Sequence, residues 1–277
     1  MEKELFGRVA LITGGREGMG RAVAELLAEK GSSVVIVSRN KEELEKVAKE
    51  ISKLTNNENV LAIAGDVSKI IDVENVVNET LKKFGKIDYL INFAGYNLDY
   101  GKISLMRPHP EAAGILRKIV DVDLLGTFNM ICYVEPVMRK QNCGVIITVA
   151  STPVLDVWEN DLLFQIAKVG NKQMTEVIAR QHKVDGITGI KIYCIAPGNV
   201  FNRSTYESLT EEQRKAADEE GWLDSRMHIA KIVYWLITGK LKRESGSTIR
   251  IDASTVSNIF KEVGEEYKPL NIHYFIC

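Results

Sequence analysis

The amino-acid sequence predicts an α/β domain built on a doubly wound parallel sheet of about seven strands. Two observations favour this class. Short, β-branched apolar runs alternate with longer amphipathic segments from residue 8 to residue 252, as strands and helices do in parallel α/β sheets. No linker rich in Pro, Gly or Ser interrupts this alternation, so we expect residues 1–252 to form one domain.

The first strand and the turn after it occupy residues 8–20, Arg-Val-Ala-Leu-Ile-Thr-Gly-Gly-Arg-Glu-Gly-Met-Gly. We expect Gly14 to allow a tight turn, Gly18 to admit a pyrophosphate, and Gly20 to let the following helix pack closely. The N-terminus of that helix offers free N–H groups and the positive end of its dipole. The segment therefore predicts a dinucleotide-binding turn. Its predicted binding residues are Thr13, Gly14, Arg16, Gly18, Met19 and Gly20.

The second strand, residues 33–37, ends in Ser38 and Arg39. A carboxylate at this strand end would accept hydrogen bonds from ribose hydroxyls and repel a 2′-phosphate, whereas a guanidinium binds that phosphate. Ser38 and Arg39 therefore favour NADP(H) over NAD(H). Glu17, an acidic residue in the glycine-rich turn, argues the other way, and a solvated strand-end residue is the alternative interpretation of Arg39.

The next elements follow the same alternation. Residues 41–54 carry apolar side chains at helical spacing, and residues 60–64 form a third apolar run that leads into Asp66 and Val67. A simple structural role for Asp66 is to cap a helix that begins near Ile70. The later predicted elements are a helix to about residue 84, a strand at 88–92, a long apolar helix at 111–139, strands at 144–149 and 189–196, a helix at 229–237 and a strand at 247–252.

Several motifs stand at the ends of these strands. Thr13 to Gly20 reads Thr-Gly-x-x-x-Gly-x-Gly, the fourth strand ends in Asn-Phe-Ala-Gly, and the sixth is followed by Pro-Gly-Asn-Val-Phe-Asn. On these motifs, the chain resembles the short-chain dehydrogenase/reductase family from about residue 5 to residue 252. The resemblance implies a Rossmann-type domain that binds a nicotinamide dinucleotide. The further cofactor-binding residues that it implies are Asp66, Val67, Asn92, Ala94, Gly95, Lys168, Pro197, Gly198, Val200 and Asn202.

Catalysis in this family is assigned to a Ser, a Tyr thirteen residues later and a Lys four residues beyond the Tyr. Ser151, Phe164 and Lys168 occupy these three positions here. Residues four apart share one helix face, so a Tyr–Lys pair would present phenol and ammonium together, and the ammonium would lower the pKa of the phenol. Phe164 has no proton to donate. The reaction therefore needs a non-standard proton donor.

A second departure from the family is Asp123, which occupies the position of a helix Asn. We expect Asp123 to form an ion pair with Lys168. The pair is interpreted either as a structural salt bridge or as a replacement proton relay. Other substitutes for the missing phenol are Lys168 itself and tyrosines in later loops; Tyr96, which follows Gly95 directly, is the most plausible of these.

Two functions remain open from the sequence. The first is an NADP(H)-dependent oxidoreductase that transfers hydride between nicotinamide and a carbonyl or alcohol substrate. The second is a dinucleotide-binding protein without dehydrogenase activity, acting as a sensor, scaffold or partner subunit. The second function is favoured by Phe93, Asp123 and Phe164, because each stands where the family has a different polar residue. The retention of Ser151 and Lys168 favours the enzyme.

Composition limits the partners. The net charge is −1, with both signs interspersed, so we expect a small-molecule substrate and neither nucleic acid nor membrane. The four histidines are scattered, which predicts no metal site. The four cysteines have no close pair, and we interpret them as core thiols. The N-terminus lacks a signal-peptide pattern, and a cytoplasmic location is expected.

Two further segments are interpreted from their composition. Residues 203–222 are polar, and the capping box at Thr210 opens a short helix that forms a substrate lid or an exposed connector. Residues 253–277 are an aromatic extension expected to pack on the same domain or a neighbouring subunit. The family resemblance implies a homodimer or homotetramer built on the helix at 111–139 and the helix after residue 161. The first of these is apolar enough that burial on several faces is expected.

Overall fold

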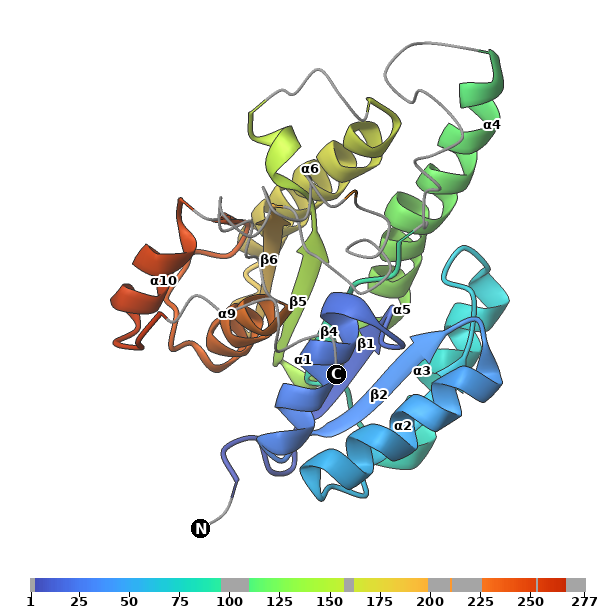
Figure 1. The fold of residues 1–277 in the computed structure, drawn as a ribbon, viewed down its shortest axis with the longest axis vertical. Coiled ribbons are helices and arrows are strands. Elements are labelled where there is room, and N and C mark those ends of the chain that lie inside the picture. Colours follow the sequence, from blue (N-terminus) through green and yellow to red (C-terminus); the bar gives the residue numbers. More distant parts are fainter. Residues whose placement is uncertain are drawn as a thin grey trace.

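The computed structural model describes residues 3–95, 110–156, 162–198, 210, 226–252 and 254–267. Within them, seven strands form one sheet in the order β3-β2-β1-β4-β5-β6-β7 (Figure 1). All six neighbouring pairs are parallel. The predicted doubly wound α/β fold is confirmed. Because the chain reverses its direction of winding between β1 and β4, their carboxyl ends form the crevice where ligands bind in such sheets.

The strands lie within two residues of the predicted positions, because each is a short β-branched run between turn residues. Side chains alternate between the two faces of the sheet. Leu11 faces one apolar core, whereas Ala10 and Ile12 face the other. The strands are β1 Val9–Thr13, β2 Ser33–Ser38, β3 Val60–Ala64, β4 Tyr89–Asn92, β5 Gly144–Val149, β6 Ile190–Pro197 and β7 Thr248–Ile251.

Helices cover both faces of the sheet (Figure 1). One core is shared by α1, α2, α9 and α10, and the other by α3, α5 and α6. The helices are α1 Gly18–Glu29, α2 Lys41–Thr55, α3 Ile70–Phe84, α4 Pro110–Ile119, α5 Gly126–Gln141, α6 Leu162–Val184, α9 Arg226–Thr238 and α10 Val256–Glu262, with a short 3-10 turn, η2, at Thr152–Val154.

The long helix expected at 111–139 runs from Pro110 to Gln141 but changes character in the middle. A π-helical segment, η1 (Val120–Leu125), joins α4 to α5. In Figure 1, α4 projects beyond the strands beside the first turns of α6. In the single chain Leu125 and Phe128 are exposed, so the expected burial on several faces would need a second subunit.

The C-terminal segment adds an aromatic cluster to α9. In Figure 1, α10 lies beside α9, and the Phe260 ring centroid lies 4.7 Å from that of Trp235 and 5.1 Å from that of His228. Tyr267 follows, with its ring centroid 5.5 Å from that of Phe260. These aromatic side chains extend the core on the α1–α9 face of the sheet. The remaining residues of the extension and nearly all of the predicted lid lie outside the described ranges.

Two minor expectations are wrong. Cys194 is buried, but Cys132 and Cys143 are exposed, because apolar neighbours in sequence can lie on the other side of a helix or turn. Asp66 does not cap α3: the N-cap residue is Lys69, and the Asp66 carboxylate accepts hydrogen bonds from the backbone N–H and Oγ of Ser68 at 3.0 and 2.7 Å. Within the described ranges, none of the helices combines the length and apolarity that a membrane span requires.

Candidate active site

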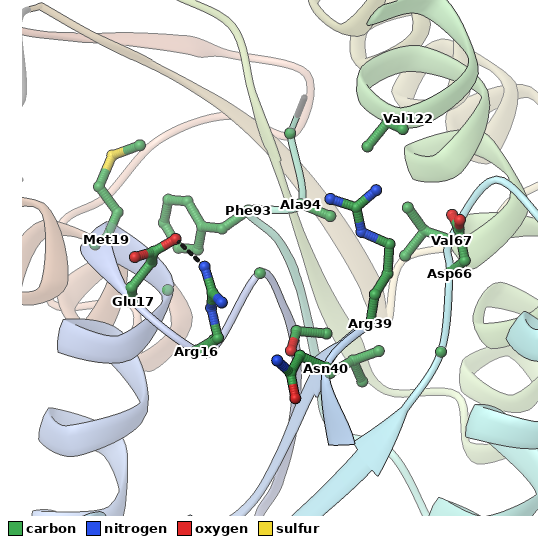
Figure 2. Close-up of a pocket in the computed structure, with 17 residues that line it drawn as sticks. Arg16, Glu17, Met19, Arg39, Asn40, Asp66, Val67, Phe93, Ala94 and Val122 are labelled. Atoms are coloured by element: carbon green, nitrogen blue, oxygen red, sulfur yellow. Dashed lines mark hydrogen bonds and ion pairs between the residues drawn. The ribbon is translucent and has the colours of Figure 1, made fainter. Parts of the chain in front are cut away.

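A cavity of about 720 Å³ lies at the carboxyl ends of β1, β2, β3 and β4 (Figure 2). Most of the predicted cofactor-binding residues in the described ranges line it, together with several that sequence reasoning did not include. The predicted ones are Gly14, Arg16, Gly18, Met19, Gly20, Ser38, Arg39, Asp66, Val67, Ala94 and Gly95, and the additional ones include Glu17, Asn40, Phe93 and Val122.

Two further predicted residues near this cavity, Thr13 and Asn92, connect the ends of the strands that border it. Thr13 is buried, and its Oγ1 accepts a hydrogen bond from the Ala94 N–H at 3.1 Å. Asn92 is buried as well, and its amide donates to the Ile147 carbonyl at 3.2 Å. These two contacts join the ends of β1, β4 and β5. Thr13 and Asn92 therefore position the strand ends and do not themselves line the cavity.

The glycine-rich turn has the geometry that a pyrophosphate needs. Gly14 has φ +66°, and a Cβ there would lie 2.6 Å from the Phe93 carbonyl. A Cβ on Gly20 would lie 2.4 Å from the Gly14 carbonyl oxygen, whereas Gly18, with φ +60°, faces open space. Glu17 makes no side-chain capping bond at the start of α1, so the first N–H groups of this 12-residue helix are available to an anion. The turn therefore fits a dinucleotide phosphate.

Two arginines in the cavity have different surroundings. Figure 2 shows Arg16 turned toward Glu17; their ion pair measures 2.6 Å, and Arg16 also pairs with Glu43. Arg39 instead extends between Ala94 and Val67. Burial raises the pKa of Asp66, but hydrogen bonds from Ser68 and the charge of Arg39 outweigh it and hold the pKa below the usual range. The Arg39 guanidinium forms no ion pair with any described residue.

A buried ion pair adjoins the Gly95 end of the cavity. Lys168 Nζ lies 2.9 Å from Asp123 Oδ2, and the two side chains are 8% and 1% exposed. A Cβ on Gly95, which lines the cavity, would lie 3.3 Å from that same Oδ2, so a larger residue there would crowd the pair. The ion pair predicted between Asp123 and Lys168 is present. It lies beside the cavity, next to its lining residue Val122.

Phe164 and Ser151 complete this region. The Phe164 ring centroid lies 5.1 Å from Lys168 Nζ, and the ring packs against the apolar cluster that α4 and α6 share, which includes Ile119. Ser151 follows β5 and donates a long hydrogen bond of 3.4 Å to the Pro197 carbonyl, which leaves its hydroxyl weakly engaged. Neither residue lines the cavity described above.

Sequence reasoning missed Asn171, which binds the backbone of Asp123. Asn171 is buried, and its amide donates to the backbone carbonyls of Asp123 and Val149, each at 3.0 Å. The first carbonyl belongs to η1 and the second to the end of β5. Asn171 therefore ties the π-helical segment to the sheet. A detectable signal was a polar residue three positions after Lys168 on the same helix face.

Replacing Asn171 by leucine is expected to lower the free energy of unfolding by about 1–3 kcal/mol, because two buried carbonyls each lose one hydrogen bond. Urea denaturation measures the change. Gln173 is exposed on the same helix, so Gln173→Leu is the matched control and should stay within about 0.5 kcal/mol. Equal effects of the two replacements would contradict a clamping role for Asn171.

Three predicted residues, Tyr96, Val200 and Asn202, lie outside the described ranges. Pro197 ends β6, and the Gly198 N–H donates to the Ile251 carbonyl at 2.8 Å. No group of His, Cys, Asp and Glu suited to a metal occurs among the described residues.

The fold and the cavity define a dinucleotide-binding α/β domain. The short chain dehydrogenase family model matches residues 8–213, and the chain belongs to the short-chain dehydrogenase/reductase family, whose members are oxidoreductases that use nicotinamide cofactors.

Relatives and a solved structure agree with this assignment. A 3-oxoacyl-[acyl-carrier-protein] reductase of Thermotoga maritima is 28% identical over 91% of this chain and 99% of its own length. A peroxisomal 2,4-dienoyl-CoA reductase of Danio rerio is 31% identical over 74% of this chain and 65% of its own length. The crystal structure of levodione reductase has a TM-score of 0.78 and 28% identity, covering 92% of this chain and 99% of that one.

Proposed function

We propose that the protein is an NADP(H)-dependent oxidoreductase that transfers hydride between nicotinamide and a carbonyl or alcohol substrate, with a proton donor other than residue 164. The observation that carries this proposal is the continuity of the site. One cavity extends from the glycine-rich turn to Gly95 and Val122, beside the Asp123–Lys168 ion pair. A dinucleotide held by the turn would thus point its reactive end toward a fixed positive charge.

Each part of this site has a distinct task in the proposal. The N–H groups at the start of α1 bind the pyrophosphate, and Asp66 and Val67 border the adenine. The nicotinamide supplies or accepts the hydride. Ser151 and the Lys168 ammonium stabilise the negative oxygen of the substrate, while Asp123 holds Lys168 in place. Tyr96 remains a candidate for the proton donor.

The names of these relatives support a reductase but do not specify its substrate. One name specifies an oxoacyl compound and another a dienoyl compound. In the first the reducible group is a ketone, and in the second it is an alkene in conjugation with a carbonyl. We therefore extend to this chain only the shared chemistry, a hydride addition that places negative charge on a carbonyl oxygen.

The preference for NADP(H) rests on Arg39 in the proposal, because Arg16 is already paired with Glu17 and Glu43. Replacing Arg39 by serine is expected to weaken NADPH binding by about 10- to 100-fold, the loss of one charge-assisted contact, and to leave NADH binding nearly unchanged. Fluorescence titration with both cofactors measures the ratio. Arg16→Ser is the matched control and should change the ratio less; the reverse order would contradict the assignment to Arg39.

The same titration, followed by a panel of carbonyl compounds, tests the proposed function. NADPH binding with turnover of any carbonyl compound is the expected result. Tight binding without turnover in the whole panel would favour the alternative of a dinucleotide-binding protein without dehydrogenase activity. Absence of binding to either cofactor would overturn the proposal.

We also propose a homodimer or homotetramer built on α5 and α6, since several apolar side chains on these helices and at the adjoining end of η1 are exposed in the single chain. They are Leu125, Phe128, Leu162, Ile166, Val169 and Val177. A patch of this kind marks an interaction surface.

Combining Phe128→Asp with Val169→Asp, at positions that are 47% and 48% exposed, is expected to lower the mass in solution to that of one chain. Two carboxylates buried without partners would cost more than such an interface supplies. Size-exclusion chromatography with light scattering measures the mass. Leu54→Asp on α2, on the other face of the sheet, is the control and should leave the assembly intact. A double variant that keeps its mass would contradict this interface.

A further inference from the structure

We propose that the carbonyl substrate is an α,β-unsaturated one, and that Lys168 holds its negative oxygen as an enolate instead of donating a proton to it. This inference rests on the proposed function. It follows from three observations: the hydrocarbon ring of Phe164 at the proton-donor position, the short Lys168–Asp123 ion pair, and the burial of both its members.

Lys168 lies between a buried carboxylate and an aromatic ring. The Asp123 carboxylate is almost fully buried and has the Lys168 ammonium 2.9 Å away. Transfer of a proton from Lys168 to a substrate would remove this positive charge from beside a buried anion, and such a loss is strongly unfavourable. The Phe164 ring, with its centroid 5.1 Å from Nζ, adds a second contact that favours the cation. Lys168 is therefore suited to stabilise negative charge without releasing a proton.

The position of Lys168 allows it to reach a substrate oxygen. Asn171, one turn later on α6, binds the carbonyl of Val149 at the end of β5, and Ser151 follows that same strand end. Lys168 and Ser151 thus lie at one end of β5. An ammonium group has three N–H donors, and Asp123 takes one of them through Oδ2. A further N–H and the weakly engaged Ser151 hydroxyl form a site for an anionic oxygen.

Phe164 places a hydrocarbon ring at the proton-donor position, and this separates two classes of reduction. Hydride addition to a saturated ketone produces an alkoxide, a base so strong that a proton must arrive with the hydride. Hydride addition to the β-carbon of a conjugated alkene breaks the carbon–carbon π bond and moves its electrons through the α-carbon to the oxygen. The enolate shares its charge between oxygen and α-carbon, so a fixed cation and a hydroxyl can hold it.

The balance of the second reaction needs no side-chain acid. The reduced nicotinamide dinucleotide is oxidised as it gives the hydride to the β-carbon. Water then supplies a proton to the α-carbon, and the carbonyl is restored as the electrons return. The alkene, the reduced dinucleotide and one proton become the saturated carbonyl compound and the oxidised dinucleotide.

Binding of an enolate analogue tests this assignment without turnover. The phenolate form of 4-nitrophenol carries a negative oxygen on an sp² carbon and absorbs differently from the phenol. The wild-type protein with NADP⁺ bound is expected to bind the phenolate, and Lys168→Gln should weaken this binding roughly 10-fold or more. Lys172→Gln, which removes a lysine paired with Glu176 in the next turn of α6, is the matched control. Equal phenolate binding by wild type and Lys168→Gln would overturn the role of Lys168.

Paired substrates test the substrate class. Each pair shares one carbon skeleton: 2-cyclohexenone with cyclohexanone, and the N-acetylcysteamine thioesters of crotonate and acetoacetate. The conjugated member of at least one pair should oxidise NADPH roughly 100-fold faster than its partner, the span that a missing general acid explains. In D₂O, deuterium should enter the α-carbon. Faster reduction of the saturated ketones would overturn the inference and leave the proposed function intact. Reduction of neither class would overturn both.

Discussion

Phe164→Tyr is expected to raise the rate at which the protein reduces saturated ketones with NADPH by about 10²–10⁴-fold, the contribution of a positioned general acid. Residue 164 lies one turn before Lys168, with the ring centroid 5.1 Å from Nζ. A phenol at this position would have a cation nearby, which lowers the pKa of the phenol. The initial rate of NADPH consumption measures the gain, and reduction of a conjugated alkene should change far less.

Ile166→Tyr is the matched control, because it adds a phenol to an exposed position of the same helix. It should produce no gain. Activity that appears only in Phe164→Tyr, with none in the wild type toward either substrate class, would favour a dinucleotide-binding protein without dehydrogenase activity. A Phe164→Tyr protein that binds NADPH and reduces ketones no faster than wild type would contradict the assignment of residue 164 to the proton-donor position.

Asp123→Leu is expected to lower the free energy of unfolding by about 3–5 kcal/mol, because it leaves the buried Lys168 ammonium without its ion-pair partner. Lys168→Met should have an effect of the same size for the complementary reason. The double variant should recover most of the loss, since apolar side chains of similar volume replace a buried pair at little cost. Urea denaturation of the four proteins gives the coupling free energy directly.

The control for this cycle is the pair Lys172–Glu176, which lies on the same helix at 2.6 Å, with both side chains 30% exposed. Its coupling should be about 0–1 kcal/mol. A coupling free energy for Asp123 and Lys168 no larger than this value would mean that burial does not strengthen the pair.

The fold and the cofactor cavity could be predicted because their signals are local. The strand runs and the spacing of Gly14, Gly18 and Gly20 lie within single short segments, and backbone sterics give such patterns few solutions. The partner of Lys168 could be predicted as well, because the family register placed Asp123 opposite it. These predictions depend only on the order of the elements along the chain.

The features that could not be predicted depend on distant contacts. The Asn171 amide donates to two carbonyls, one in η1 and one at the end of β5. No local sequence pattern predicts which carbonyl a buried amide will bind. Asp66 illustrates the converse. Its position before α3 favoured a helix cap, but the Ser68 hydroxyl and N–H were nearer partners. The exposure of Cys132 likewise depends on which side of α5 faces the sheet. The apolar residues next to Cys132 in the sequence do not determine that side.

The π-helical segment Val120–Leu125 changes the direction in which side chains point along one long helix. Each residue of a regular α-helix advances the side chains by about 100°, and a π turn takes up an extra residue without ending the helix. Ile119, before the segment, faces the Phe164 cluster, whereas Met130, after it, faces the sheet. Asp123 lies in the segment between these two parts of the helix. Insertion or deletion of one residue in this segment would rotate one part of the helix against the other. Such a change would therefore alter the core packing and the direction of the Asp123 carboxylate at the same time.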